Sequence, residues 1–281
     1  MHPLDGAWSK LEWAKTHVDT IRAAIPDSVD RDGVHTLNTR REYKANVGAV
    51  VAVVESMPEL PKDLSLIIGD GLHNFRSSLD LAWWQLAVKH LARVPTDEEA
   101  ASIQFPIRRP GKNFEPATHA HWVGQQAVDV AESVQPNMGW DPTNATDPPD
   151  PMGALRYLSN IDKHRVLVVT FFRIHGLTVQ NPGPDQIRDC ILDTNRTPDG
   201  SGSIQLPSAA LRPQPGSEVG RIYVHATGLN PDVDFNPEAT TAICVERWRL
   251  FPLFDAIGTQ IASILDRFEP ILKTGPDPPS T

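Results

Sequence analysis

A proline-free stretch between Pro61 and Pro95 is the strongest constraint on how this chain can fold. Within it, apolar residues recur at three- and four-residue steps, which is the spacing of one face of an α-helix. These residues are Ile68, Leu72, Phe75, Leu79, Ala82 and Leu86. The pattern predicts a long helix over residues 62–92 with one continuous apolar face buried in the core.

The opposite face of this predicted helix is rich in side chains that make directional hydrogen bonds. It carries Asp70, His73, Ser77 and Asp80, flanked by Asn74 and Arg76. Solvated helix faces are mostly Lys and Glu, whereas these residues are poorer helix formers. Gly69 and Gly71 weaken the helix by about 1 kcal/mol each relative to alanine, so we expect another backbone or a ligand to come close to them. The face is thus either a binding site or an ordinary solvated surface.

A second polar cluster closes the predicted helix at 153–164. Arg156, Asn160, Lys163 and His164 share one face of it, and Arg165 follows directly. Basic residues in a last helical turn are also favoured by the helix dipole, so the cluster has a purely structural explanation as well. If it meets the polar face of the 62–92 helix, however, the two would line a pocket suited to phosphate or carboxylate oxygens.

We therefore predict a ligand-binding pocket between the two helices. Its candidate residues are Asp70, His73, Asn74, Arg76, Asp80, Asn160, Lys163, His164 and Arg165. The expected ligand is small, phosphorylated and nucleotide-like. The arginine and lysine side chains would neutralise phosphate, and the histidine and asparagine side chains would hydrogen-bond base, sugar or phosphate. A formal net charge of −9 makes extended nucleic acid an unlikely partner.

The remaining pattern predicts an α+β fold. We expect a helical core with an inserted β-hairpin and a small C-terminal antiparallel sheet closed by a long C-terminal helix. The expected elements are a helix at 4–25, a hairpin at 36–57, a loop-like region at 95–121, a short helix at 122–134, short strands within 176–247 and a helix at 249–270. The expected domains are a helical core with hairpin and site at 1–175, the small sheet at 176–248, the C-terminal helix packing on the core at 249–272, and a tail at 273–281.

Several classes of protein are disfavoured by the sequence. The two cysteines lie outside any CxxC pair, and no HxxxH or HExxH occurs, so neither a metal nor another cofactor is expected. No signal peptide and no apolar run of about 20 residues is present, which favours a cytoplasmic protein without a membrane span. A homodimer remains open. The basic loop IRRPGK at 107–112 is either an anion contact or a solvated loop.

Three segments together resemble a family of uncharacterised proteins that is common in actinobacteria and their phages. They are GDGLHNFRSSLD at 69–80, FPI at 105–107 and NIDKHR at 160–165. The resemblance implies a site at these segments and a phage or defence setting. It does not imply a particular chemistry. In the family an aspartate–histidine pair often follows RSxL, whereas here Asp80 is followed by Leu81.

The family pattern also resembles the Arg-x4–6-His signature of HEPN ribonucleases, helical enzymes that cleave RNA without metal. No arginine of this chain is followed by a histidine at that spacing, so a HEPN-like enzyme would use His73 or His164 as its catalytic group. Three hypotheses follow. The protein binds a small phosphorylated ligand as a defence-related sensor or sequestering protein, or it is a HEPN-like metal-independent ribonuclease or phosphodiesterase. Alternatively, it is a non-catalytic structural or interaction protein whose polar clusters form an internal network.

Overall fold

The structure, a computed structural model, has an α+β fold, as predicted. It describes residues 2–25, 34–36, 38–44, 47–53, 61–109, 112–137, 139–141, 150–164, 167, 169–170, 176–179, 194–196, 202–204, 218–225, 237–240, 243–246 and 248–273. The chain divides into two units. A helical unit comprises Met1–Ala24, Lys62–Val168 and Phe251–Thr281, and a strand-rich unit comprises Ile25–Pro61 and Val169–Leu250.

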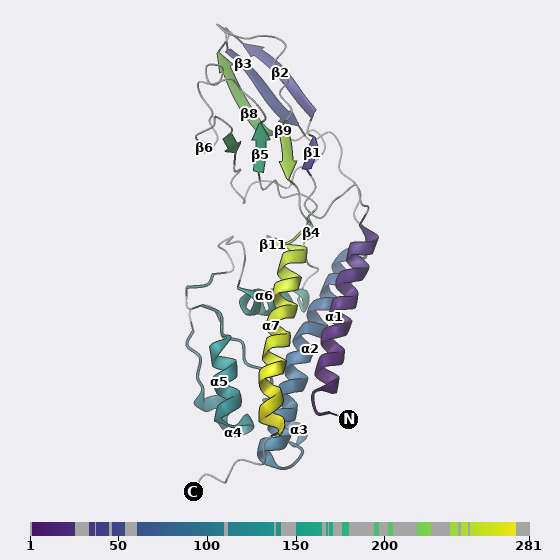
Figure 1. Cartoon of the computed structure of the whole chain (residues 1–281), viewed down its shortest axis with the longest axis vertical. Helices are drawn as coiled ribbons and strands as arrows, with labels where there is room; N and C mark the ends of the chain where they lie inside the picture. The colour runs from purple at the N-terminus through teal and green to yellow at the C-terminus, as the bar shows by residue number, and fades with distance from the viewer. Residues whose placement is uncertain are drawn as a thin grey trace. The chain divides into compact units, whose positions relative to one another are not determined.

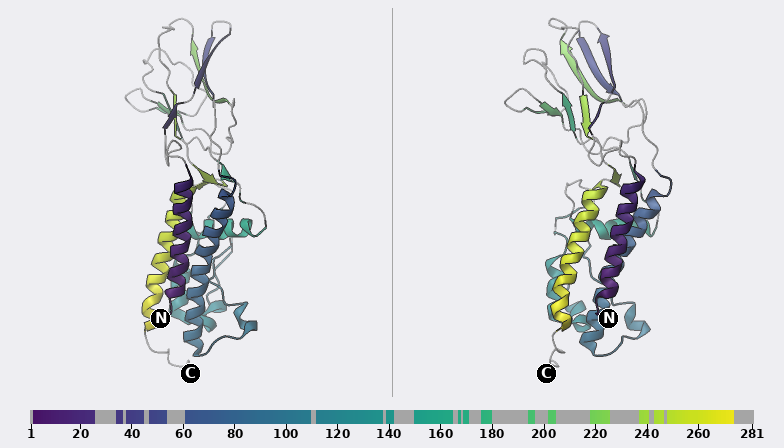
Figure 2. Two further views of the ribbon diagram at one scale, coloured as in Figure 1. Left: turned by 90° about the vertical axis from the view of Figure 1, so that its right-hand side faces the viewer. Right: turned by 45° about the vertical axis from the view of Figure 1, so that its right-hand side comes forward.

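Three long helices form the frame of the helical unit. They are α1 (Asp5–Ala24), α2 (Leu64–Leu91) and α7 (Leu250–Lys273), and they lie side by side (Figures 1 and 2). The six apolar residues predicted for the buried face of α2 are all buried. Phe75 of α2 packs edge-on against Phe254 of α7, with ring centroids 5.5 Å apart, and Trp83 packs against Phe268 at 6.0 Å. The apolar face of α2 is therefore the centre of this core.

The two glycines of α2 are explained by the protein's own side chains. A Cβ atom at Gly69 would lie 2.5 Å from Asp162 Oδ1, and one at Gly71 would lie 3.1 Å from Phe254 Cε1. Real Cβ contacts are essentially never shorter than 3.0 Å. Close approach does occur, but it is made by the side chains of Asp162 in α6 and Phe254 in α7 rather than by the expected backbone or ligand.

Four shorter helices complete the helical unit. They are α3 (Asp97–Ala100), α4 (Ala117–Val123), α5 (Gln125–Ser133) and α6 (Pro151–Asp162). The region 95–121 is thus not purely loop-like, as its sequence suggested, because Thr96 and Glu99 form a capping box that starts α3, and Pro116 precedes α4. The Asp150 carboxylate caps α6 by accepting a hydrogen bond from the Gly153 amide at 2.9 Å.

Antiparallel sheets make up the strand-rich unit. The predicted hairpin is present as β2 (Asn38–Lys44) and β3 (Val47–Val53), paired from Asn38 with Val53 to Lys44 with Val47. A third strand, β8 (Glu218–His225), pairs with the other edge of β3. This pairing groups the hairpin with the later strands, which corrects the predicted domain that joined it to the helical core.

The other strands form two further sheets. One has the order β1 (Val34–Thr36), β9 (Pro237–Thr240), β5 (Gly176–Val179), β7 (Gly202–Ile204) and β6 (Thr194–Arg196). The second has the order β11 (Trp248–Arg249), β10 (Cys244–Val245) and β4 (Val169–Thr170). The predicted tail from residue 274 onward lies outside the described residues. Within the described ranges, no helix is both long enough and apolar enough to cross a membrane.

Candidate functional site

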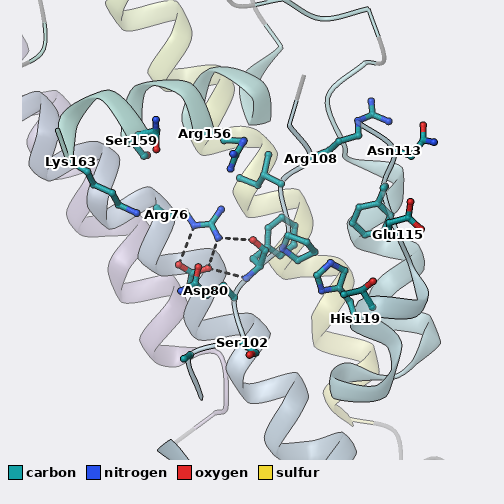
Figure 3. Close-up of a pocket in the computed structure, with 18 residues that line it drawn as sticks. Arg76, Asp80, Ser102, Arg108, Asn113, Glu115, His119, Arg156, Ser159 and Lys163 are labelled. Carbon is teal, nitrogen blue, oxygen red and sulfur yellow. Dashed lines mark hydrogen bonds and ion pairs between the residues drawn. The ribbon is translucent and has the colours of Figure 1, made fainter. Parts of the chain in front are cut away.

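A cavity of about 570 Å³ lies within the helical unit, bounded by α2, α6 and the segment 101–119 (Figure 3). Helix α2 contributes Arg76 and Asp80 to its wall. Helix α6 and the residue after it contribute Arg156, Ser159, Asn160 and Lys163. The segment 101–119 contributes the third side, including Phe105, Arg108, Phe114, Glu115 and His119. The volume is in the range of small-molecule sites, which is about 300–1,000 Å³.

Arg76 is held in place by a carboxylate and a backbone carbonyl. Its Nε donates to Asp80 Oδ2 at 3.1 Å, and its Nη2 donates to Asp80 Oδ1 at 2.9 Å and to the Phe105 carbonyl at 2.6 Å. The Phe105 amide in turn donates to Asp80 Oδ1 at 2.9 Å. Two of the segments singled out in the sequence, RSSLD and FPI, are therefore bonded to each other. Arg76 Nη1 has no hydrogen-bond partner among the described residues.

The segment 105–108 is fixed from a second side by Gln135, just beyond α5. The Gln135 side chain donates to the Pro106 carbonyl at 2.9 Å and to the Ala131 carbonyl at 2.7 Å, and its oxygen accepts from the Arg108 amide at 2.6 Å. Because both sides of the segment are hydrogen-bonded, this wall of the cavity is positioned before any ligand arrives.

The cavity carries an excess of positive charge. Four cations line it, namely Arg76, Arg108, Arg156 and Lys163, against the carboxylates of Asp80 and Glu115. Arg156 is partly buried and has no carboxylate partner in the part of the chain that the structure describes. Burial holds the pKa of the Arg156 guanidinium below its ordinary value, and the charges of Arg109 and Arg76 lower this pKa further. An anion bound beside Arg156 would favour the charged guanidinium and so raise this pKa again.

Aromatic rings line another part of the cavity. His119 of α4 stacks on Phe114, with ring centroids 5.7 Å apart and an interplanar angle of 20°. The edge-on ring of Trp83 lies 6.4 Å from His119 on another side. Burial, followed by the charge of His121, lowers the pKa of His119 below its ordinary value of 6.5, so its imidazole is neutral at pH 7.

Ser159 supplies an unused polar atom. Its Oγ is buried in the wall formed by α6 and has no hydrogen-bond partner among the described residues. A buried hydroxyl without a partner costs about 1–3 kcal/mol. The hydroxyl is covered by the protein itself, so it is not presented to a ligand in the cavity.

The structure brings together only part of the predicted site. Arg76, Asp80, Asn160 and Lys163 line the cavity, whereas Asp70, His73, Asn74 and His164 do not. Asn74 instead accepts a hydrogen bond from Lys10 of α1 at 3.1 Å. Arg165 lies outside the described residues. The two polar faces therefore meet at a cavity only from Arg76 onward along α2.

The remaining predicted residues lie on the surface near the end of α6. Asp70, His73 and His164 are exposed. Burial raises the pKa of Asp162, and so does the charge of Asp70, while His73 lowers it. This places Asp70 and His73 electrostatically close to Asp162. Neither histidine expected for a HEPN-like enzyme lines the cavity.

The predicted site omits most of the cavity lining, including Arg156, Arg108, His119 and Ser159. Arg156 shares a helix face with Asn160 and Lys163, so its helical spacing already indicates that it belongs to the same site. Arg108 belongs to the basic loop 107–112, whose sequence fits either an anion contact or a solvated loop. His119 and Ser159 gave no usable signal, because only the packing of α4 and α6 around the segment 105–108 brings them to one cavity.

The fold and the cavity define an α+β protein with a positively charged cavity in its helical unit. No protein-family model, no curated protein and no solved structure matches this chain. The resemblances to the actinobacterial and phage family and to HEPN ribonucleases therefore stay predictions. In the described ranges, no group of three or more His, Cys, Asp and Glu side chains is arranged to hold a metal ion.

Proposed function

We propose that the protein binds a small phosphorylated ligand in the cavity between α2, α6 and the segment 101–119. The observation that carries this proposal is the partly buried Arg156, which has no carboxylate partner in the described ranges and is repelled by Arg76 and Arg109. A partly buried cation beside two like charges is destabilised in its charged form. Retaining one in a cavity is understandable when an anion supplies the missing charge.

The donors around Arg156 suit a phosphate group. Arg76 offers its Nη1, since its other guanidinium nitrogens are occupied by Asp80 and Phe105. Arg156 can form paired hydrogen bonds to two phosphate oxygens, and Lys163 adds a point charge. Binding without bond cleavage suits a sensor or sequestering protein.

Thermal unfolding with inorganic phosphate tests the proposal. The variants are Arg156→Gln and, as a matched control, Lys15→Gln, which also removes one positive charge but on the exposed surface of α1. Phosphate is varied at millimolar concentration while sodium chloride keeps the ionic strength constant, because phosphate salts stabilise proteins non-specifically at high concentration.

We expect phosphate to raise the unfolding temperature of the wild type and of Lys15→Gln, but not that of Arg156→Gln. Without phosphate, Arg156→Gln should be at least as stable as the wild type, because the repulsion by Arg76 and Arg109 is removed. An equal phosphate effect in all three proteins would contradict the proposal. It would favour an internal polar network with no ligand.

A further inference from the structure

The cavity has two chemically different sides. Figure 3 shows Lys163 and Ser159 on one side and Glu115 and His119 on the other, with Arg156 directed into the space between them. The first side offers the ammonium donor of Lys163. The second combines the ring pair Phe114–His119 with the Glu115 carboxylate. A phosphate ion alone would occupy only the first side.

The second side fits a planar ring better than another anion. Phe114 and His119 are only partly buried and both line the cavity. The neutral His119 imidazole adds no repulsion toward a neutral ring. Aromatic side chains stack on every nucleobase, because each base has a π-face. The carboxylate of Glu115 would repel a second phosphate, but it accepts hydrogen bonds from sugar hydroxyls or from a base amino group.

The size of the cavity agrees with such a two-part ligand. A space of about 570 Å³ is that of a site for a drug-sized molecule rather than for a single ion. The charge balance also limits how many phosphate groups the ligand can carry. Arg76 is already paired with Asp80. Of the cations that line the cavity, only Arg156, Lys163 and Arg108 have no carboxylate partner in the described part of the chain.

We infer that the ligand is a nucleoside monophosphate whose base packs against Phe114 and His119 and whose phosphate binds Arg156 and Lys163. This inference rests on the proposed function, since it assigns a chemical class to the ligand of the same cavity. Asp80 acts as a positioning residue that keeps Arg76 Nη1 directed at the phosphate.

Titration calorimetry with the full chain at constant ionic strength tests the inference. The ligands are the four ribonucleoside 5′-monophosphates, ribose 5-phosphate and inorganic phosphate. The proteins are the wild type, Phe114→Leu, and Trp13→Leu as a control that removes an aromatic ring from an exposed position on α1.

We expect at least one of the four nucleotides to bind the wild type fivefold or more tightly than ribose 5-phosphate does, since stacking of one base on an aromatic side chain is worth at least that factor. Phe114→Leu should remove this advantage and leave the affinity for ribose 5-phosphate unchanged. Trp13→Leu should behave as the wild type. Saturation-transfer NMR of the bound nucleotide provides a second readout on the wild type, with the largest transfer at the base protons.

The possible failures are distinguishable. If ribose 5-phosphate binds as tightly as every nucleotide, the nucleoside assignment is overturned while the proposed phosphate site stands. If transfer is largest at the ribose protons, the base does not pack against the aromatic pair, and the assignment fails in the same way. If no phosphorylated compound binds, the proposed function itself fails.

Discussion

Asp80 Oδ1 lies 2.9 Å from both the Arg76 Nη2 atom and the Phe105 amide nitrogen, so one carboxylate oxygen joins a helix to the segment that passes beside it. Arg76 completes the link by donating to the Phe105 carbonyl. The side chain of Arg76 is 19% exposed and that of Asp80 is 31% exposed, so water competes only partly for these bonds. Arg76 and the segment 105–108 therefore share the Asp80 carboxylate as an anchor.

Replacing Asp80 by Asn should weaken both the fold and the site. The amide keeps the size of the side chain but loses the charge, and one end of it presents a donor to another donor. We expect the free energy of unfolding to fall by about 1.5–3 kcal/mol, as for other hydrogen bonds to charged groups. Phosphate affinity should also fall, because Arg76 loses its fixed orientation. Urea unfolding and calorimetry measure the two effects.

The matched control is Asp255→Asn. Asp255 also accepts two hydrogen bonds from an arginine, Arg22, at 3.1 Å each, but its side chain is 62% exposed. Exposed ion pairs of this kind are worth about 0–1 kcal/mol. Equal losses of stability in Asp80→Asn and Asp255→Asn would mean that the link to Phe105 contributes nothing.

Changing Gln135 to Glu should loosen the other side of the segment 105–108. The Gln135 amide donates to two carbonyl oxygens, and a carboxylate in its place would face both oxygens without a proton to donate. We expect a loss of about 1–3 kcal/mol at pH 7 in chemical unfolding. Gln126→Glu is the control, because Gln126 is exposed near the start of α5, where a negative charge is tolerated. The prediction fails if both variants unfold at the wild-type midpoint.

Gly153→Ala should destabilise α6 although alanine is the better helix former. The new Cβ would lie 2.8 Å from the ring of the buried Trp140, and such overpacking costs about 1–3 kcal/mol. Gly258→Ala is a matched substitution on α7, where the nearest atom, Phe75 Cε1, is 3.5 Å away. It should be neutral or stabilise by up to about 1 kcal/mol. Circular dichroism melting compares the two, and a stabilised Gly153→Ala would contradict the close contact with Trp140.

Acidification should destabilise the protein partly through His119. Burial keeps the pKa of His119 in the folded state below 6.5, whereas the unfolded chain binds this proton near 6.5. The unfolded state therefore carries more protons as the pH falls through 6.5, and the free energy of unfolding decreases. His119→Gln should show a shallower decrease between pH 8 and pH 5 in urea unfolding. An identical slope in both proteins would show that His119 does not take part.

The sequence carried clear information about helices and about parts of the site. The apolar spacing on α2 identified its buried face, because a helix repeats every 3.6 residues whatever surrounds it. Gly69 and Gly71 indicated close approach, since their helix-weakening cost needs a compensating contact. Arg76, Asp80, Asn160 and Lys163 were recognised from residue type and helix face, and all four line the cavity.

The sequence could not show which polar groups converge. Asp70, His73 and Asn74 have the same character as Arg76 and Asp80, yet they lie outside the cavity, because its boundary depends on where the segment 105–108 crosses α2. Similarly, the hairpin β2–β3 joined the later strands because β8 pairs with the free edge of β3, a choice that local pattern does not specify.

The sequence by itself determined the long helices, their buried faces and the presence of basic groups at 76 and 163, because periodicity and residue chemistry are local properties. Tertiary structure alone decided that Arg156, His119 and Ser159 face the same space as Arg76, and that Asp80 is shared between a helix and a loop. The physical reason is that a cavity is what remains when several elements pack. Its lining depends on their mutual positions, which no single segment encodes.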